Sequence, residues 1–269
     1  MADDPSIASV RFQIDASNDY LIVWTAIMFW DWWITLPLEI RAVWMAKVSC
    51  YKVSYLLQRY GSLVFMTIAT AILLIDVPKK TCARLFWIET LGLDYVLVTS
   101  DALLAVRVYA MFNRCRAALI SLTALISLEI AVLVAASCFV KPVFFPHDYA
   151  VLVNGVGCVA GDGPFAGIAF LFYVAPFVVN CVLLAATLYQ SWRITRRLEG
   201  TKLPILTRLK RDGIGYFMCI TAVNAINVYF WSQPNDAIKS FNISAVFAVS
   251  STLSCRLALS LHNTKSKPA

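Results

Sequence analysis

Long apolar runs recur along the chain and are separated by short segments that carry most of the charge. Seven runs have about the 20 mostly apolar residues that a helix needs to cross the hydrocarbon core of a bilayer. They cover residues 20–38, 55–75, 85–111, 117–140, 165–190, 213–231 and 243–261. Strands of a membrane barrel would instead alternate every second residue over about ten residues. The pattern therefore predicts an all-α integral membrane protein, a bundle of seven transmembrane helices.

The composition supports the same class of protein. Of the 269 residues, 60% are hydrophobic and 14% are charged, whereas a soluble domain is roughly 45–50% apolar and about 25% charged. Disordered chains are poor in aromatic residues and rich in charge, so disorder is excluded as well. We expect the chain to lie in the plasma membrane or the endoplasmic reticulum, with the lipid bilayer as its surroundings.

Basic residues between the runs predict the orientation. Lys and Arg concentrate in the first, third and fifth connections and in the C-terminal tail, and basic loops stay on the cytosolic side. The N-terminus is thus predicted outside and the C-terminus in the cytosol. The expected organisation is an extracytosolic segment (1–19), a membrane domain (20–262) and a cytosolic tail (263–269).

The fifth connection, residues 192–212, is the densest basic segment. It has two interpretations, an anchor that fixes the topology and a docking site for a cytosolic protein. The net charge of +7 is explained by the excess of Lys and Arg in the predicted cytosolic connections and by their attraction to anionic lipid. It indicates no nucleic-acid partner.

Two of the eight cysteines, Cys82 and Cys158, fall on the predicted outer side, where disulfides form. They are either a disulfide that ties the longest outer connection to the third helix or two free thiols. The two histidines, His147 and His262, lie outside the runs. Since zinc sites and Ser-His-Asp triads need histidine within the site, we expect no metal. No phosphate-binding glycine motif is present, so we expect no cofactor.

Ionisable residues inside a membrane are costly and point to function or to tight pairing. Five of them, with charges of both signs, fall in the predicted cytosolic half: Asp31, Arg59, Asp101, Arg107 and Arg256. We interpret this set as a polar clasp that fixes helix packing through paired charges. The alternative is a switch whose ion pairs break on activation.

Three acids have no basic residue predicted at their depth: Glu89, Asp94 and Glu129. Asp94 and Asp101 share a helix face, because they are seven residues apart. An unpaired buried acid favours its neutral form, which donates a hydrogen bond or a proton. We expect these acids to line an outer cavity with Trp87 and Tyr95, as ligand-binding or catalytic groups. Alternatively they are protonated acids bonded to neighbouring Ser, Thr or Asn. Asn180, Asn224 and Asn227 are expected to hydrogen-bond between helices.

Several segments together resemble a known family. They are Phe29 to Leu36 (FWDWWITL), Glu39 to Trp44 (EIRAVW) and Tyr55 to Tyr60 (YLLQRY), followed by segments around Arg107, Arg211 and Arg256. The chain resembles multi-pass membrane proteins of mushroom-forming fungi that carry an N-terminal domain of unknown function. The resemblance is most specific over residues 30–65. It implies seven helices and a membrane location but no established activity, and it adds Glu39 to the polar clasp.

The sequence supports two functional hypotheses. The first is a receptor-like seven-helix protein that senses a small hydrophobic ligand from the outer side. The alternative is an integral membrane enzyme, such as a proton-initiated terpene cyclase, which would use a buried carboxylic acid and aromatic faces to form and stabilise a carbocation. Whether the protein is an enzyme is left open by the sequence.

Overall fold

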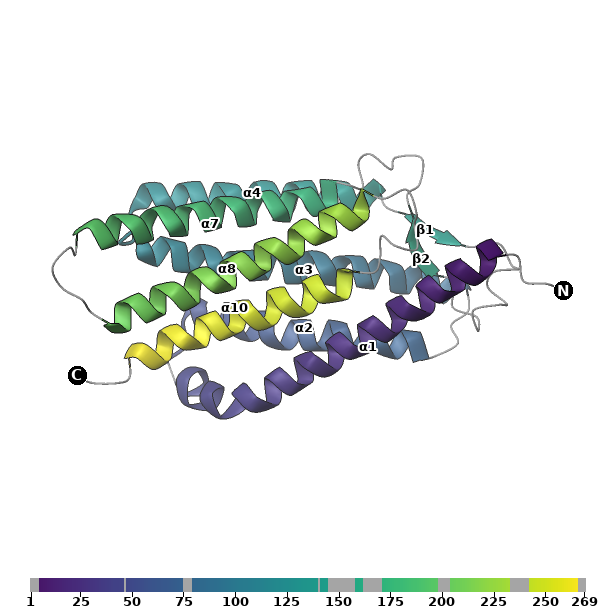
Figure 1. Cartoon of the computed structure of the whole chain (residues 1–269), viewed down its shortest axis with the longest axis horizontal. Coiled ribbons are helices and arrows are strands. Elements are labelled where there is room, and N and C mark those ends of the chain that lie inside the picture. The colour runs from purple at the N-terminus through teal and green to yellow at the C-terminus, as the bar shows by residue number, and fades with distance from the viewer. Residues whose placement is uncertain are drawn as a thin grey trace.

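The computed structural model describes residues 5–45, 47–74, 79–139, 141–144, 158–161, 171–197, 204–232 and 242–265. Within them, seven helices of 23 to 35 residues form one elongated bundle (Figure 1). These are α1 (Pro5–Glu39), α2 (Cys50–Leu74), α3 (Lys79–Met111), α4 (Arg116–Phe139), α7 (Leu171–Arg197), α8 (Pro204–Trp231) and α10 (Ile243–Lys265). The prediction of a helical bundle is confirmed.

Five helical segments of the described chain are long and apolar enough to cross a membrane, in α1 with the turn after it, α4, α7, α8 and α10. The helices α2 and α3 are outside this set, and both carry polar residues such as Arg59 and Asp101. Both side chains are buried within the protein, and α3 packs against α2, α4, α7 and α10. A central helix faces protein on most sides, so low hydropathy is compatible with its position.

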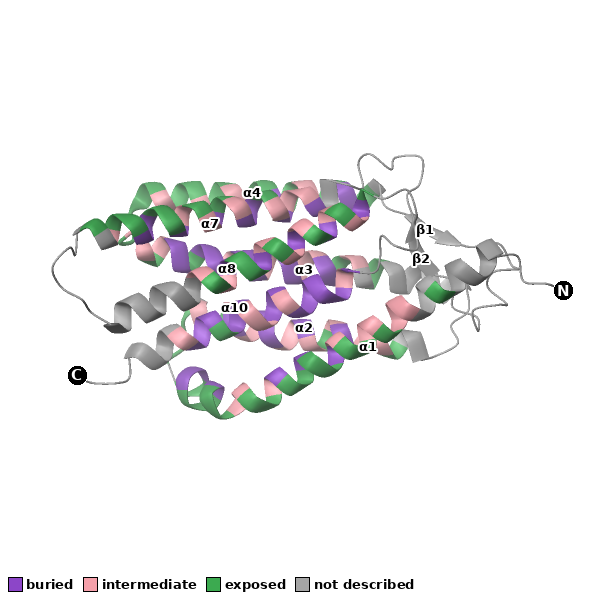
Figure 2. Ribbon diagram, viewed as in Figure 1, coloured by how far each residue is buried: buried purple, intermediate pink, exposed green. Residues whose placement is uncertain are grey.

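The outward faces of the bundle are apolar, which is the reverse of a soluble protein. Figure 2 shows exposed residues along α1 and α4, and Trp30, Trp33 and Ile120 are each about two-thirds exposed. A soluble monomer rarely presents apolar surface of this extent. The protein is therefore suited to a lipid environment, as an integral membrane protein.

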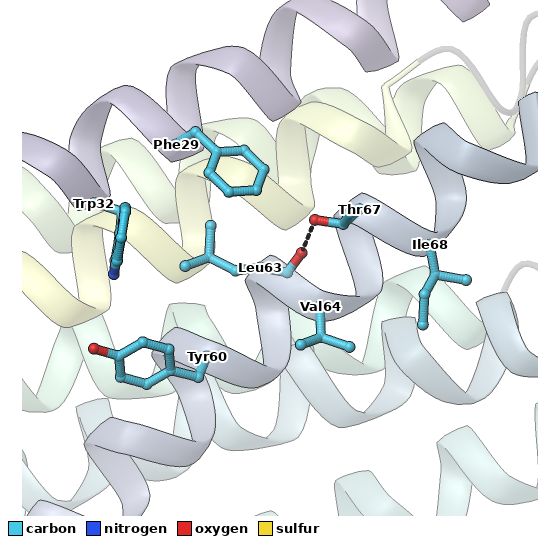
Figure 3. Close-up of a pocket in the computed structure, with 7 residues that line it drawn as sticks. All are labelled: Phe29, Trp32, Tyr60, Leu63, Val64, Thr67 and Ile68. Atoms are coloured by element: carbon cyan, nitrogen blue, oxygen red, sulfur yellow. Dashed lines mark hydrogen bonds between the residues drawn. The ribbon is translucent and has the colours of Figure 1, made fainter. Parts of the chain in front are cut away.

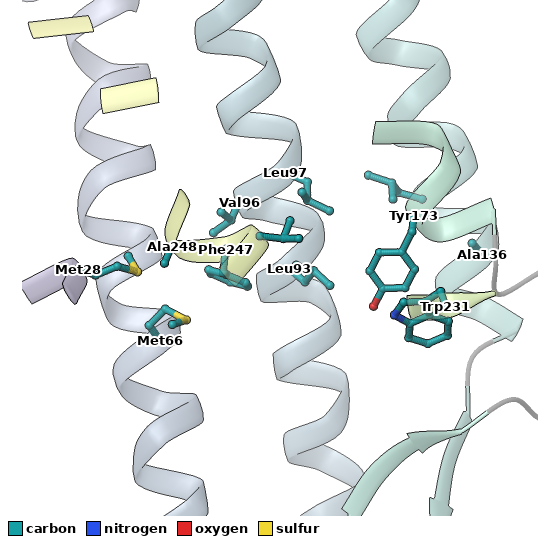
Figure 4. Packing of buried hydrophobic residues seen from close by; sticks show 12 residues of the cluster. Met28, Met66, Leu93, Val96, Leu97, Ala136, Tyr173, Trp231, Phe247 and Ala248 are labelled. Atoms are coloured by element: carbon teal, nitrogen blue, oxygen red, sulfur yellow. The ribbon is translucent and has the colours of Figure 1, made fainter. Parts of the chain in front are cut away.

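Among the described residues, the largest core cluster contains side chains from all seven helices (Figure 4). Met28 of α1 and Met66 of α2 lie together on one side, and Tyr173 of α7 and Trp231 of α8 on the other. The last two rings are 4.4 Å apart between centroids. Leu93 and its neighbours on α3 lie between these two groups, so α3 is the central packing surface.

Three elements differ from the sequence prediction. The helix α1 begins at Pro5, within the segment assigned to the extracytosolic N-terminus. Of the predicted basic linker 192–212, residues up to Arg197 belong to α7 and those from Pro204 belong to α8. Two short strands, β1 (Lys141–Phe144) and β2 (Cys158–Gly161), pair antiparallel in the predicted outer connection. Apolar runs identify the part of a helix that is suited to lipid. They do not reveal where the helix continues into a polar sequence.

Gly61 of α2 is required for the close approach of α2 to α3. A Cβ atom at this position would lie 2.5 Å from the Tyr95 ring. We expect Gly61→Ala to lower the free energy of unfolding by about 1–3 kcal/mol, the usual cost of overpacking. Thermal unfolding of the detergent-solubilised protein measures this change.

The matched control is Gly215→Ala in α8, where nothing lies within 4 Å of the added carbon. This substitution is expected to leave stability unchanged or to raise it, because alanine is the better helix former by about 1 kcal/mol. Equal losses of stability in the two variants would contradict the assigned packing of α2 on α3.

Candidate functional site

A buried network of charges joins α1, α2 and α10. The carboxylate of Asp31 binds two guanidinium groups, Nη1 of Arg59 at 3.1 Å and Nε of Arg256 at 2.5 Å. Nε of Arg59 also binds Oε2 of Glu39 at 3.1 Å. Two acids are thus matched by two bases, and the network is neutral if all four are charged. We call these four residues the α1–α2–α10 ion network.

Arg59 is the centre of this network. Its side chain is 4% exposed and contacts both acids, while Nη2 donates to the Thr35 hydroxyl and to the Asp31 carbonyl. Paired charges at such depth are stable only when their remaining hydrogen-bonding atoms also have partners. Arg256, by contrast, has a side chain that is 42% exposed. The network is therefore buried at its centre, Arg59, and partly exposed at Arg256.

Glu39 accepts hydrogen bonds from three aromatic side chains besides its bond with Arg59. The donors are the Trp44 indole at 3.1 Å, the Tyr55 hydroxyl at 3.3 Å and the Tyr60 hydroxyl at 2.8 Å. Glu39 is completely buried. Its charge is thus held by donors from the turn after α1 and from α2.

The local backbone explains how Trp44 reaches Glu39. The helix α1 ends at Glu39 and continues as a π-helical turn over Ile40–Trp44. Such turns are rare and occur often at functional sites. The turn brings the indole of Trp44 back to the carboxylate five residues earlier.

Two other residues assigned to the polar clasp, Asp101 and Arg107, lie away from this network. Asp101 accepts two bonds from Nδ2 of Asn180 in α7, both at 3.1 Å, and its carboxyl group neighbours that of Glu129 in α4. Arg107 is buried, and its Nη1 has no hydrogen-bond partner among the described residues. Six residues were assigned to the polar clasp, and the structure brings four of them together: Asp31, Glu39, Arg59 and Arg256.

The acids predicted for an outer cavity are also separated. Asp94 accepts a bond from the Ser137 hydroxyl of α4 at 2.9 Å, whereas Glu129 lies beside Asp101. Seven residues along α3 correspond to about 10 Å, so Asp94 and Glu129 occupy different levels of the bundle. The side chain of Glu89 falls outside the described residues. Of the two aromatic candidates, Tyr95 packs against Phe65 at 5.6 Å between centroids and Trp87 is 41% exposed.

An open apolar groove of about 360 Å³ lies between α1 and α2. Figure 3 shows that α1 contributes Phe29 and Trp32 and that α2 contributes the other wall. The lining residues of α2 are Tyr60, Leu63, Val64, Thr67 and Ile68. The phenol of Tyr60 lines the groove while its hydroxyl binds Glu39, so the groove borders the ion network directly.

The disulfide prediction concerns Cys82 and Cys158, whose side chains are outside the described residues. Five cysteines that the structure does describe are free thiols: Cys115, Cys138, Cys181, Cys219 and Cys255. In the same part of the chain, no group of three or more His, Cys, Asp or Glu side chains could hold a metal ion. Within the described part of the basic segment, the guanidinium of Arg196 stacks on Trp192 at 4.0 Å from the ring centroid.

Sequence reasoning missed the partners of Glu39 and the pairing of Asp101 with Glu129. The tyrosines at 55 and 60 are part of the same motif as Arg59, and their spacing from it could have indicated a shared acceptor. The pairing of the two acids had no such signal, because it depends on which helices are neighbours.

One known family matches part of the chain. Residues 20–64 match the model of a family of unknown function, DUF6533. No curated protein matches the sequence. The matched segment contains Asp31, Glu39 and Arg59, so it contains three of the four residues of the ion network. It overlaps the stretch of residues 30–65 in which the sequence resemblance is most specific.

Proposed function

We propose that this integral membrane protein is a receptor-like seven-helix protein that responds to a small hydrophobic ligand. In this proposal α2 and α3 also cross the membrane, with the N-terminus outside and the C-terminus in the cytosol. The start of α1 and the end of α10 lie at opposite ends of the bundle (Figure 1), as an odd number of crossings requires. The proposal rests most on one observation, the direct contact between the groove and the ion network.

A continuous set of contacts leads from the groove to α10. Tyr60 lines the groove and donates to Glu39, which binds Arg59. Arg59 binds Asp31, and Asp31 binds Arg256 of α10. A ligand that moves the Tyr60 ring would change the donors to Glu39. The ion network would then pass the change to the helix that ends in the cytosol.

The groove has the properties expected of a site entered from the bilayer. Its lining is almost entirely apolar, and it is open along one side. It has the size of a small ligand pocket, since such pockets occupy roughly 300–1,000 Å³. This proposal replaces the outer cavity of acids as the ligand site, because Asp94 and Glu129 are at different levels. A cytosolic protein would then dock at the basic segment 192–212.

Filling the groove tests the proposal. We expect Val64→Trp to occupy the groove and to abolish ligand-dependent stabilisation. Purified protein in lipid nanodiscs would be screened by thermal unfolding against sterols, prenyl alcohols and fatty acids. A ligand at 100 times its Kd raises the stability by about 2.7 kcal/mol, and the variant should lose this increase.

The matched control is Val134→Trp on α4. Val64 and Val134 are both 55% exposed, but Val134 does not line the groove. The control should keep the ligand response of the unmodified protein. If none of the three ligand classes stabilises the protein, or if the two variants lose the response equally, the groove is not a ligand site.

The enzyme alternative has no comparable support in the described residues. A proton-initiated cyclase needs a carboxylic acid that faces its substrate cavity. The groove has no acid in its lining. The acids Asp94, Asp101 and Glu129 contact other helices instead.

A further inference from the structure

The interface of α3, α4 and α7 holds two acids and one amide that are almost inaccessible. Asp101, Glu129 and Asn180 are each 1–2% exposed. The two carboxyl groups are direct neighbours, and Nδ2 of Asn180 donates to both oxygens of Asp101. Three helices therefore meet at one pair of acids, away from the α1–α2–α10 ion network.

The hydrogen bonds at this interface are incomplete on one side. The two oxygens of Asp101 share one donor, Nδ2 of Asn180, which also donates to the Pro176 carbonyl. Neither oxygen of Glu129 has a hydrogen-bond partner within the described part of the chain, nor has Oδ1 of Asn180. A buried carboxylate without a donor or a cation costs several kcal/mol. Glu129 is therefore not stable here as an ionised group.

Cations on the same and neighbouring helices are bound elsewhere or lie at another level of the bundle. Arg59 of α2 and Arg256 of α10 bind the acids of the ion network. Arg107 lies six residues beyond Asp101 in α3, about 9 Å along the axis. The helix α7 has no Asp, Glu, Lys or Arg before Arg193.

Apart from Arg107 and the basic residues near the helix ends, the titratable groups on these helices carry no positive charge. Asp94 of α3 is bound to Ser137, one level away from the pair. The helix α7 contributes the neutral side chains of Tyr173, Cys181 and Tyr189, and α4 contributes Cys138. The part of α8 from Ile214 to Trp231 has no charged residue.

We infer that Asp101 and Glu129 form a buried proton-binding site. One proton is bound between the two carboxyl groups. Glu129 carries it and donates its O–H to Asp101, and the ionised Asp101 also accepts from Asn180. The pair then has one negative charge instead of two, and Glu129 has a hydrogen bond. The proton links α4 to α3, while Asn180 links α7 to the same acid.

Infrared spectroscopy and pH-dependent unfolding test this inference on the full chain in nanodiscs. Glu129→Gln replaces the O–H donor by an N–H donor of similar shape. We expect it to fold and to lose one carbonyl band of a protonated acid. Asp94→Asn serves as a comparison within the bundle, and Asp19→Asn, at an exposed position, should leave the band intact.

The pH dependence has a definite sign. Above about pH 5 the unfolded chain has released this proton, whereas the folded protein keeps it. Unfolding then releases one proton, so the folded protein loses stability as the pH rises, by up to about tenfold in the unfolding equilibrium for each pH unit. Glu129→Gln should remove this contribution relative to the unmodified protein.

Two results would overturn the inference. One is a Glu129→Gln variant that is folded and keeps every acid carbonyl band and the full pH dependence. The other is stabilisation by Na⁺, but not by choline at equal ionic strength, that disappears in Glu129→Gln. That second result would assign the site to a metal cation in place of a proton.

Discussion

Arg59→Ala is expected to destabilise the protein more than any other single substitution in the ion network. It removes the only side chain that binds both Asp31 and Glu39 in the described structure. Breaking a buried ion pair on one side typically costs about 3–5 kcal/mol, because the partner charge stays buried. Here two acids lose a partner at once. Thermal unfolding with size-exclusion chromatography in detergent would measure the loss.

Arg256→Ala is the matched control for this substitution. Both arginines bind Asp31, but the Arg256 side chain is 42% exposed and the Arg59 side chain is 4% exposed. Half-exposed ion pairs contribute about 0–1 kcal/mol, so the control should lose much less stability. Similar losses from the two substitutions would show that Arg59 is not the centre of the network.

Glu39→Ala is the second substitution with a large expected effect. It leaves the donors of Trp44, Tyr55 and Tyr60 without their acceptor and removes one of the two acids that bind Arg59. Of the groups left unsatisfied, Tyr55 and Arg59 are buried, and we expect a loss of about 3–5 kcal/mol. Glu39→Gln keeps an acceptor oxygen but not the charge, so it should lose less.

A double-mutant cycle shows whether the two residues act together. Glu39→Ala and Arg59→Ala combined should cost less than the sum of the single losses, because the second substitution removes a charge that the first left unpaired. Coupled neighbours typically differ from additivity by about 0.5–3 kcal/mol. Additive losses would mean that Glu39 and Arg59 stabilise the protein independently, which contradicts the proposed path from Tyr60 to Arg256.

The ends of several helices could be read from the sequence because lipid imposes a strict rule on composition. The apolar run 117–140 corresponds to α4 at Arg116–Phe139, and the run starting at residue 243 corresponds to α10 from Ile243. The rule fails where a helix leaves the apolar layer. The start of α1 at Pro5 has polar residues on both sides, so hydropathy gives no sign of it.

The site could be predicted only in part, because depth along a helix does not determine which helix is the neighbour. The seven-residue spacing correctly places Asp94 and Asp101 on one face of α3, since both contact α4, through Ser137 and Glu129. The sequence offered no means to see that this face meets α4 and not Arg59. The sequence therefore predicts Asp101 as part of the polar clasp, whereas in the structure its carboxyl group lies beside Glu129 and Asn180.

The π-helical turn Ile40–Trp44 constrains how many residues this stretch contains as well as which residues they are. A π turn accommodates one residue more than an α turn between bonded groups. Deleting a single residue here would allow ordinary α-helical closure and would rotate the residues after the deletion by about 100° around the axis. The Trp44 indole would then point away from Glu39. Natural variants of this chain should therefore tolerate exchange of side chains within the turn more readily than any gain or loss of a residue.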